Sequence, residues 1–222
     1  MIGMNKEEKP TSETLNDDEI ITRILHGDKN LYSLIVRRYN QRLYRVGMSI
    51  INDDAEVEDA MQVAYINAYE SLGKFAFRSS FPTWLTRILI NECLLRLRKR
   101  KKSISMNDEN MENVMSQNKA PQTPVTATVN SELRSILNDA IRRLPEIYRT
   151  VFVMREIENM NIAETKECLN ISEVNVKVRL NRAKAILRDL LSAQYSKDDI
   201  LHFHLSRCDR MVDTVMRSIR DL

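Results

Sequence analysis

The chain has 222 residues, of which 43% are hydrophobic and 29% are charged, with a formal net charge of +3 at pH 7. This supply of apolar side chains is enough for one or two packed domains and excludes a wholly disordered protein. Only 4 glycines and 5 prolines are present, too few for a turn-rich β protein, so we expect an all-α fold.

Residues 1–16 are polar and are expected to form a flexible tail that lacks the apolar segment of a signal peptide. No stretch of the sequence approaches the roughly 20 apolar residues of a membrane span, so we expect no membrane insertion. Cys93, Cys168 and Cys208 are odd in number and far apart, which argues against a disulfide framework. They favour a reducing compartment and hence a cytoplasmic location.

Residues 17–102 are predicted to form a first helical domain. Apolar residues recur there at spacings of three and four, which indicates amphipathic helices. The acidic residues that follow Asn52 favour a helix start, since they complement the helix dipole. Pro82 is expected in the first turn of the last helix of this domain, where proline is tolerated. Helices are expected over 17–26, 30–51, 54–75 and 82–102.

Residues 103–129 are predicted to be a flexible linker, because they are polar, contain two prolines and have no sustained periodicity. A second helical domain is expected over 130–192. Its last two helices are joined by a tight turn at Asn170, and the second of them is capped by Ser172, which predicts a helix-turn-helix. Residues 193–222 are expected to form a C-terminal extension with an amphipathic helix.

The second helix of a helix-turn-helix enters the major groove of DNA. Its apolar residues are expected to form the buried face: Val174, Val178, Ala183, Ile186, Leu187 and Leu190. Its polar residues can contact phosphates and base edges: Asn175, Lys177, Arg179, Asn181, Arg182, Lys184 and Arg188. The alternative is an ordinary amphipathic helix with a solvated basic face. The Asn turn followed by the Ser cap favours the DNA interpretation.

Aromatic and basic residues alternate around the start of the last helix of the first domain: Lys74, Phe75, Phe77, Arg78, Phe81, Trp84 and Arg87. Single-stranded nucleic acid binds such surfaces, because bases stack on aromatic rings while cations follow the phosphates. The alternative places Trp84 in the core, and the sequence does not decide between the two. Six of the seven residues from Arg96 to Lys102 are Lys or Arg, and without compensating acids they repel one another unless a polyanion is near. A membrane-surface helix is less favoured, because the segment continues into a polar linker.

Three stretches of the chain match a known family in the correct order. "FRSSFPTWLTRILINECLLRLRKRKK" resembles the second conserved region of the extracytoplasmic-function (group IV) sigma factors of bacterial RNA polymerase. "LPEIYRTVFVMREIENMNIAE" and the following "LNISEVNVKVRLNRAKAIL" are similar to the family's fourth region, and "DAEVEDAMQVAYINAY" resembles its polymerase-docking helix. The match spans Asp17 to Leu191, apart from the linker. It departs from the family's pattern at Thr165, Lys166, Asn170 and Asn175.

The resemblance implies a non-enzymatic transcription initiation factor without a cofactor or metal. Its partners would be core RNA polymerase, promoter DNA and an anti-sigma factor or other regulator. The unpaired −10 strand would be held by Phe77, Arg78, Phe81, Thr83, Trp84, Arg87, Asn91, Arg96, Arg98, Lys99 and Arg100. The −35 element would be read by Asn175, Lys177, Arg179, Asn181, Arg182 and Lys184. The polymerase would be bound by Asp53, Asp54, Glu56, Asp59, Gln62 and Tyr65.

Beyond the family match, His202, His204 and Cys208 form an H-x-H-x₃-C pattern. Three such ligands suit zinc or copper, but Cys208 also begins an apolar stripe that fits ordinary packing. We expect the end helix to pack on one of the two domains, with docking of a regulator as the alternative.

Two other functions are compatible with parts of this sequence. A repressor would use the helix-turn-helix alone, and a protein-binding helical module would use neither DNA surface. The promoter sequence, the inducing signal and the identity of any anti-sigma factor are not encoded in a readable pattern.

Overall fold

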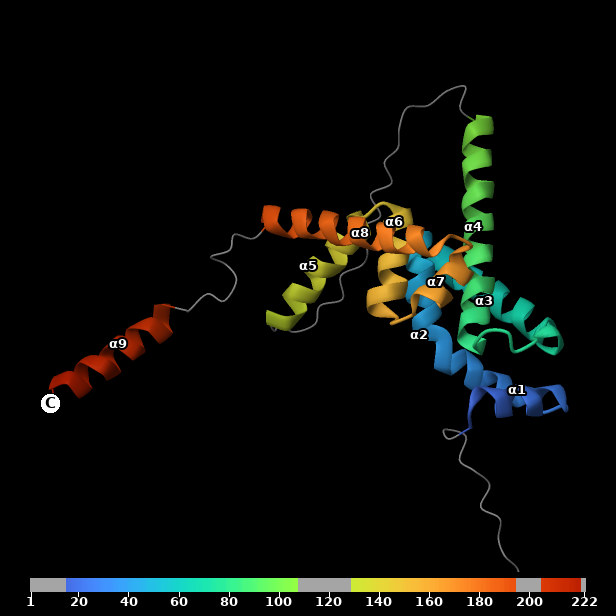
Figure 1. The fold of residues 1–222 in the computed structure, drawn as a ribbon, viewed down its shortest axis with the longest axis horizontal. Coiled ribbons are helices and arrows are strands. Elements are labelled where there is room, and N and C mark those ends of the chain that lie inside the picture. Colours follow the sequence, from blue (N-terminus) through green and yellow to red (C-terminus); the bar gives the residue numbers. More distant parts are fainter. Residues whose placement is uncertain (1–14, 108–128, 195–204, 221–222) are drawn as a thin grey trace, which may run out of the picture.

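The computed structural model describes residues 15–107, 129–194 and 205–220, and within them every regular element is a helix. This confirms the all-α prediction. The first helical unit, α1–α4, comprises α1 (Asp17–Leu25), α2 (Tyr32–Ile50), α3 (Asp54–Glu70) and α4 (Phe81–Asn107), with short 3-10 turns at Lys29–Leu31 and Leu72–Lys74. The second helical unit, α5–α8, comprises α5 (Val129–Arg143), α6 (Glu146–Phe152), α7 (Ile162–Leu169) and α8 (Glu173–Gln194). Helix α9 (Leu205–Arg220) follows (Figure 1).

Helices α2, α3 and α4 pack on one another to form the core of the first unit. The apolar stripes expected from the sequence face inward, and Leu43, Val46 and Leu85 are fully buried. Gly47 lets α2 and α3 approach closely, because a Cβ atom there would lie 2.8 Å from Cγ1 of Val57. A larger residue at this position would force the two helices apart.

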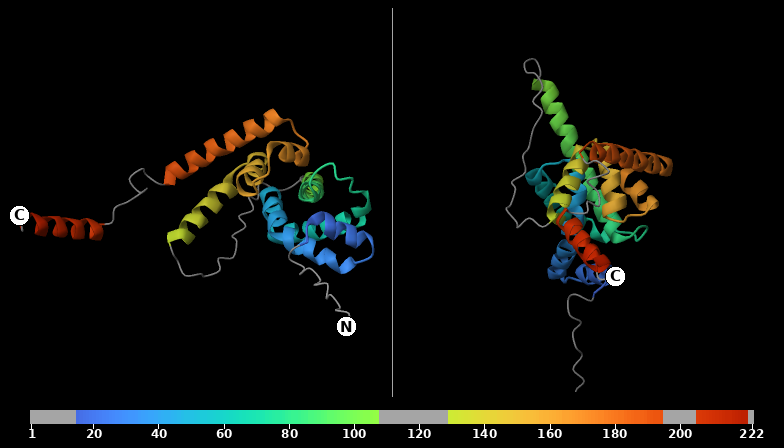
Figure 2. Two further views of the ribbon diagram at one scale, coloured as in Figure 1. Left: turned by 60° about the horizontal axis from the view of Figure 1, so that its bottom comes forward. Right: turned by 90° about the vertical axis from the view of Figure 1, so that its left-hand side faces the viewer.

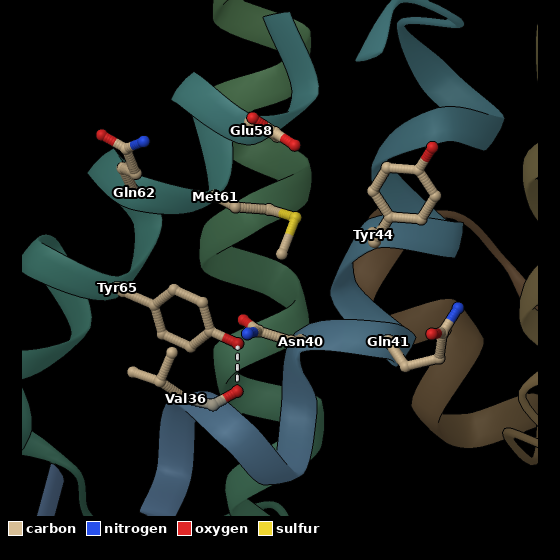
Figure 3. Close-up of a pocket in the computed structure, with 8 residues that line it drawn as sticks. All are labelled: Val36, Asn40, Gln41, Tyr44, Glu58, Met61, Gln62 and Tyr65. Carbon is tan, nitrogen blue, oxygen red and sulfur yellow. Dashed lines mark hydrogen bonds between the residues drawn. The ribbon is translucent and has the colours of Figure 1, made fainter. Parts of the chain in front are cut away.

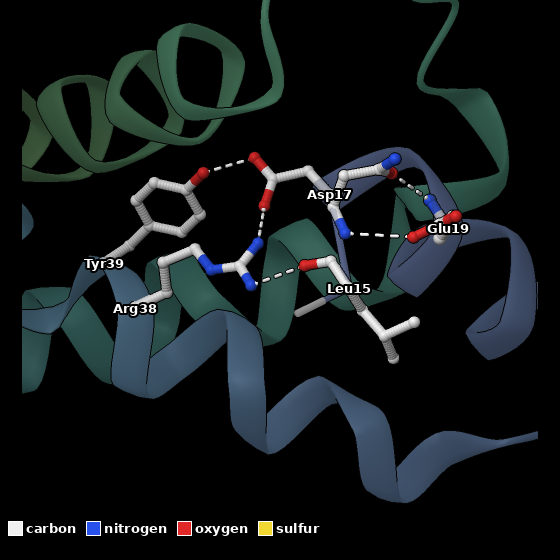
Figure 4. A network of polar contacts seen from close by, with 6 residues as sticks. Leu15, Asp17, Glu19, Arg38 and Tyr39 are labelled. Carbon is white, nitrogen blue, oxygen red and sulfur yellow. Dashed lines mark hydrogen bonds and ion pairs between the residues drawn. The ribbon is translucent and has the colours of Figure 1, made fainter. Parts of the chain in front are cut away.

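Polar contacts fix α1 against α2 (Figure 4). Asn16 and Glu19 form a reciprocal capping box at the start of α1. Arg38 of α2 donates to a carboxylate oxygen of Asp17 at 2.5 Å and to the carbonyl of Leu15 at 2.7 Å. The hydroxyl of Tyr39 donates to the other oxygen of Asp17, and burial together with this bond raises the pKa of Tyr39. The N-terminal helix is therefore held in a single orientation.

In the second unit, α6 and α8 pack together around Leu144, Val153, Ala183 and Leu187. Helix α6 ends in a π-helical turn at Val153–Ile157. Such turns are often found at functional positions. Here the turn leads into a sharp bend at Asn159, whose φ is +52°.

The two units are packed against each other, which the sequence did not predict. Helix α7 contacts α4, and α6 contacts α2 (Figures 1 and 2). Met154, Met160 and Cys168 of the second unit are buried in the same apolar cluster as the core of the first. The second unit therefore contributes these three side chains to the core of the first and keeps a separate cluster of its own.

Candidate nucleic-acid and polymerase interface

Four aromatic rings gather around the start of α4. The ring of Trp84 lies 5.1 Å from that of Phe75 and 5.6 Å from that of Phe81. Phe75 and Phe81 are buried, whereas Trp84 is half-buried against the core. Phe77 is 56% exposed and has a φ of +54°, a strained value for a bulky residue. The sequence left open whether Trp84 lies in the core or on the surface. In the structure its ring packs on the core and leaves part of its face exposed.

The remaining residues of the predicted −10 set do not share one environment. Arg78, Arg87 and Asn91 are exposed. Thr83 is fully buried, because α7 covers it. Its hydroxyl donates to Glu164 at 3.3 Å, and its carbonyl accepts from the thiol of Cys168 at 3.4 Å. In this arrangement Thr83 cannot contact DNA.

The basic run at the end of α4 has acidic partners, contrary to the sequence argument. Arg96 donates to Glu92 at 2.8 Å and lies 3.9 Å from Asp59. Arg100 lies 3.9 Å from Glu56. The acids belong to the preceding turn and to α3, so linear spacing concealed them. Arg98 and Lys99 remain exposed beside these pairs.

Helix α4 itself continues to Asn107. The first five residues of the predicted linker, 103–107, are thus helical, and the rest of it up to residue 128 lies outside the described residues.

The helix-turn-helix prediction is confirmed in its local geometry. Asn170 adopts the left-handed conformation with a φ of +51°, and the hydroxyl oxygen of Ser172 accepts from the backbone N–H of Asn175 at 3.2 Å. Thr165 is buried and donates to the carbonyl of Asn161. Lys166 projects outward and pairs with Glu173 at 3.1 Å. The departures from the family pattern are therefore accommodated without distortion.

The predicted buried face of α8 is confirmed at Ala183 and Leu187 and is wrong at Val174 and Val178. Val176, Ala183 and Leu187 are buried, whereas Val174 and Val178 are 68% and 45% exposed. The buried residues follow a spacing of seven and four, and Val174 lies two positions before the first of them, which is a rotation of roughly 200° on a helix. Two apolar side chains thus lie on the outer face of the helix.

The predicted −35 residues lie on or beside this outer face. Asn175, Lys177 and Asn181 are exposed, and Arg179 is half-buried. Arg182 donates to the hydroxyl of Tyr148 at 3.1 Å, and Lys184 pairs with Glu156 at 2.9 Å. These last two contacts hold basic side chains against α6 and its π-helical turn.

The predicted polymerase set lies along α3, beside an open groove between α2 and α3 (Figure 3). The groove is lined by Val36, Asn40, Gln41, Tyr44, Glu58, Met61, Gln62 and Tyr65. Gln62 is exposed at its edge, whereas Tyr65 is buried and donates to the carbonyl of Val36 at 3.3 Å. Tyr65 therefore forms a wall of the groove.

The acidic members of the set have local roles as well. Asp53 caps α3 by accepting from the backbone N–H of Glu56 at 3.0 Å, and Asp54 accepts from the hydroxyl of Tyr44. Glu56 and Asp59 pair with the basic run of α4, as described above. The predicted polymerase and DNA surfaces are therefore adjacent and electrostatically linked.

Arg149 joins the two units and was missed by sequence reasoning. Its Nε donates to the carbonyl of Ser49 in α2 at 2.6 Å, and its Nη1 donates to the carbonyl of Arg142 at 2.8 Å. Burial lowers the pKa of Arg149. A second bridge pairs Arg45 of α2 with Glu158. An arginine set among apolar residues, as in "YRTVF", is a sequence signal for a buried cation with a distant partner.

The stripe on α9 is exposed, at Met211, Val212, Val215, Met216 and Ile219. The expectation that it packs on one of the two domains is therefore not met. His202 and His204 lie outside the described residues, as does the side chain of Cys208, so the metal hypothesis stays a prediction.

Among the helices that the structure describes, none is both long and apolar enough to cross a membrane.

Comparisons with known proteins agree with this organisation. The family model for Sigma-70 region 2 matches residues 35–103, and that for Sigma-70 region 4 matches residues 134–187. The ECF RNA polymerase sigma factor SigW of Bacillus subtilis is 32% identical over 176 residues, which cover 77% of this chain and 94% of SigW. The ECF RNA polymerase sigma-E factor of Escherichia coli K12 is 30% identical over 178 residues, which cover 78% and 93%.

A solved structure has a similar fold. It is the sigma factor RpoE in complex with the anti-sigma factor NepR from Bartonella quintana. Its TM-score is 0.58 at 18% identity, and the match covers 74% of this chain and 98% of that one.

Proposed function

The chain belongs to the extracytoplasmic-function sigma factors, with promoter-recognition regions 2 and 4. From this premise we propose which contacts with the polymerase and the promoter each helical unit makes. Region 2 (α1–α4) binds core RNA polymerase and holds the unpaired −10 strand. Region 4 (α5–α8) reads the −35 element as duplex. The observation that carries this proposal is the presence in one chain of an aromatic and cationic surface on α4 and a helix-turn-helix ending in α8.

At the −10 element, the half-open ring of Trp84 offers a stacking platform beside the exposed Phe77. Extruding a base from the duplex costs a few kcal/mol, and stacking on an aromatic ring offsets roughly 1–3 kcal/mol of that. Arg87 and Asn91 follow Trp84 along α4, and Arg98 and Lys99 continue the basic surface for the phosphates.

At the −35 element, the outer face of α8 combines two kinds of contact. Asn175 and Lys177 can hydrogen-bond to base edges or phosphates. Val174 and Val178 supply apolar surface of the kind that contacts the methyl group of thymine in the major groove. Their exposure, which would be unfavourable in water, is explained if they meet DNA.

The groove between α2 and α3 is proposed as the docking site of core RNA polymerase, with Gln62 at its edge and Asp54 bonded to the hydroxyl of its lining residue Tyr44. We also propose an anti-sigma factor as a partner, which the complex of RpoE with NepR supports by fold. We also propose that the sigma factor itself acts in the cytoplasm.

In vitro transcription with purified core polymerase on a genomic DNA library tests the proposal. We expect initiation at a distinct set of promoters, and mapping of the start sites gives their sequences. A protein that binds duplex DNA but supports no initiation with polymerase would instead be a repressor. A protein that binds neither would be a protein-binding module.

A further inference from the structure

Helix α9 presents an apolar face that the described helices of the two units leave uncovered. Five side chains of this face are between 45% and 56% exposed: Met211, Val212, Val215, Met216 and Ile219. The helix lies apart from both units (Figures 1 and 2). Its 16 residues only slightly exceed the roughly 12–15 at which isolated helices are marginal in water, so a surface that covers this face would stabilise it.

The apolar residues of α9 repeat every seven positions. Val212 and Ile219 are seven residues apart, and Val215 follows the first of them by three, which are the a, a and d positions of a heptad. In the sequence, Leu205 and Cys208 extend the same repeat by one heptad toward the N-terminus. The exposed polar residues occupy the outer positions c and f: Arg210, Thr214 and Arg217. This is the pattern by which helices pair with other helices in a coiled coil.

The apolar face is wider than the seam of a two-stranded coil. Met211 and Met216 occupy the flanking positions g and e, and both are exposed. A seam between two helices covers mainly a and d, whereas flanking side chains are covered when each helix contacts two neighbours. Val215 at d is β-branched, as are Val212 and Ile219 at a, and β-branched residues at both positions also favour more than two strands.

Surface area predicts weak association. Full burial of a Val, Met or Ile side chain removes roughly 60–120 Å² of apolar surface from water. The five side chains are about half exposed, so one α9 can bury roughly 150–300 Å². Two helices then bury at most roughly 600 Å², below the roughly 1,200 Å² of a stable interface, and each further copy adds to the total. We therefore expect association that depends on concentration.

A membrane surface fits this helix less well than other helices do. Helices that lie on membranes usually carry Trp, Phe or Leu on one face and mainly Lys and Arg on the other. Helix α9 contains neither Trp nor Phe, and its sequence includes Asp209 and Asp213 among the arginines. A flat lipid surface also requires no heptad repeat.

We propose that α9 is a self-association helix whose partners are the α9 helices of further copies of this chain. Val212, Val215 and Ile219 form the centre of the resulting coiled coil. Helix α8 ends at Gln194 and α9 begins at Leu205, and the ten residues between them can span up to about 36 Å. The α9 helices can therefore associate without contact between regions 2 and 4 of different copies. This inference does not rest on the proposed function.

Sedimentation velocity of the full chain in reducing buffer tests the proposal, at concentrations from about 1 μM to about 0.5 mM. The average mass should rise from that of the monomer to at least about twice that value. Val215→Glu places charges at the centre of the coil and should weaken association by about tenfold or more. Thr214→Glu makes the same change of charge at the neighbouring outer position and should have little effect. Val215→Leu keeps an apolar residue at d and should retain association.

Disulfide formation tests the same contact at single positions. Cysteine is introduced at Val215 or at Thr214 in a Cys208→Ser chain, in which the remaining Cys93 and Cys168 are buried. Under mild oxidation, Val215→Cys should form disulfide-linked dimers about tenfold faster than Thr214→Cys, because only position 215 brings two copies close enough.

The proposal is overturned if the chain stays monomeric over the whole range of concentration. Equal association of Val215→Glu and Thr214→Glu, or equal rates of disulfide formation at the two positions, would also overturn it. A monomer that binds vesicles containing phosphatidylglycerol would assign α9 to a membrane surface instead. A monomer that initiates transcription leaves the proposed function intact, and an associating chain that never initiates refutes that function alone.

Discussion

The two surfaces that we propose for DNA differ in how far the chain itself covers them. On α8, the outer face that carries Val174, Asn175 and Lys177 is exposed. On α4, Thr83 is buried beneath α7, and only part of the Trp84 ring is open. If both surfaces contact DNA as proposed, α8 presents an open face to the duplex, whereas on α4 the strand can reach only the residues that α7 leaves exposed.

The largest expected effect comes from removing Arg149, which joins the two helical units. Arg149→Ala leaves the carbonyls of Ser49 and Arg142 without their charged donor, which should lower the free energy of unfolding by roughly 3 kcal/mol. Urea denaturation measures this as a lower midpoint. Arg143→Ala, an exposed neighbour on α5, should change stability by less than about 0.5 kcal/mol. Equal stability of the two variants would contradict the role assigned to Arg149.

A smaller effect is expected at the partly open ring. Trp84→Ala removes the stacking platform, so affinity for a −10 single strand should fall by about 5- to 150-fold, which corresponds to roughly 1–3 kcal/mol. Binding of a −35 duplex should be retained, because the contacts proposed for that duplex come from α8 and not from Trp84. Trp84→Phe keeps an aromatic face and should recover much of the affinity. If Trp84→Ala bound the −10 strand as tightly as the parent, the Trp84 ring would contribute to the core and not to strand binding.

The smallest effect on DNA affinity is expected at the exposed face of α8. Replacing thymine by uracil in the −35 duplex removes one methyl group, which at about 0.8 kcal/mol per buried group should weaken binding about fourfold at a contacted position. In a chain with Val174→Ala and Val178→Ala, the same replacement should have little effect. A loss of affinity that is equal in both chains would show that these valines do not read the methyl groups.

Local geometry was predictable from the sequence, since it depends on neighbouring residues. The Asn170 turn and the Ser172 cap both follow from backbone preferences. The placement of Val174 and Val178 in the buried face of α8 was wrong, because valines at these positions match a helical stripe whichever side they face.

Long-range contacts were not predictable in the same way. The acids that compensate Arg96 and Arg100 come partly from α3, and the docking of α7 on α4 joins residues more than 80 positions apart in the chain. No periodicity encodes such pairs, and the polar linker suggested independent domains. The buried Arg149 was the one local sign of a distant partner.

The proposed division of roles requires α4 to hold the −10 strand while α8 contacts the −35 duplex. In vitro transcription with core polymerase tests this requirement, by comparing the parent chain with Trp84→Ala on a promoter mapped with the parent. We expect the parent to initiate and Trp84→Ala to lose most of the initiation while it still binds the upstream duplex. Equal initiation by the two chains would contradict the role proposed for α4.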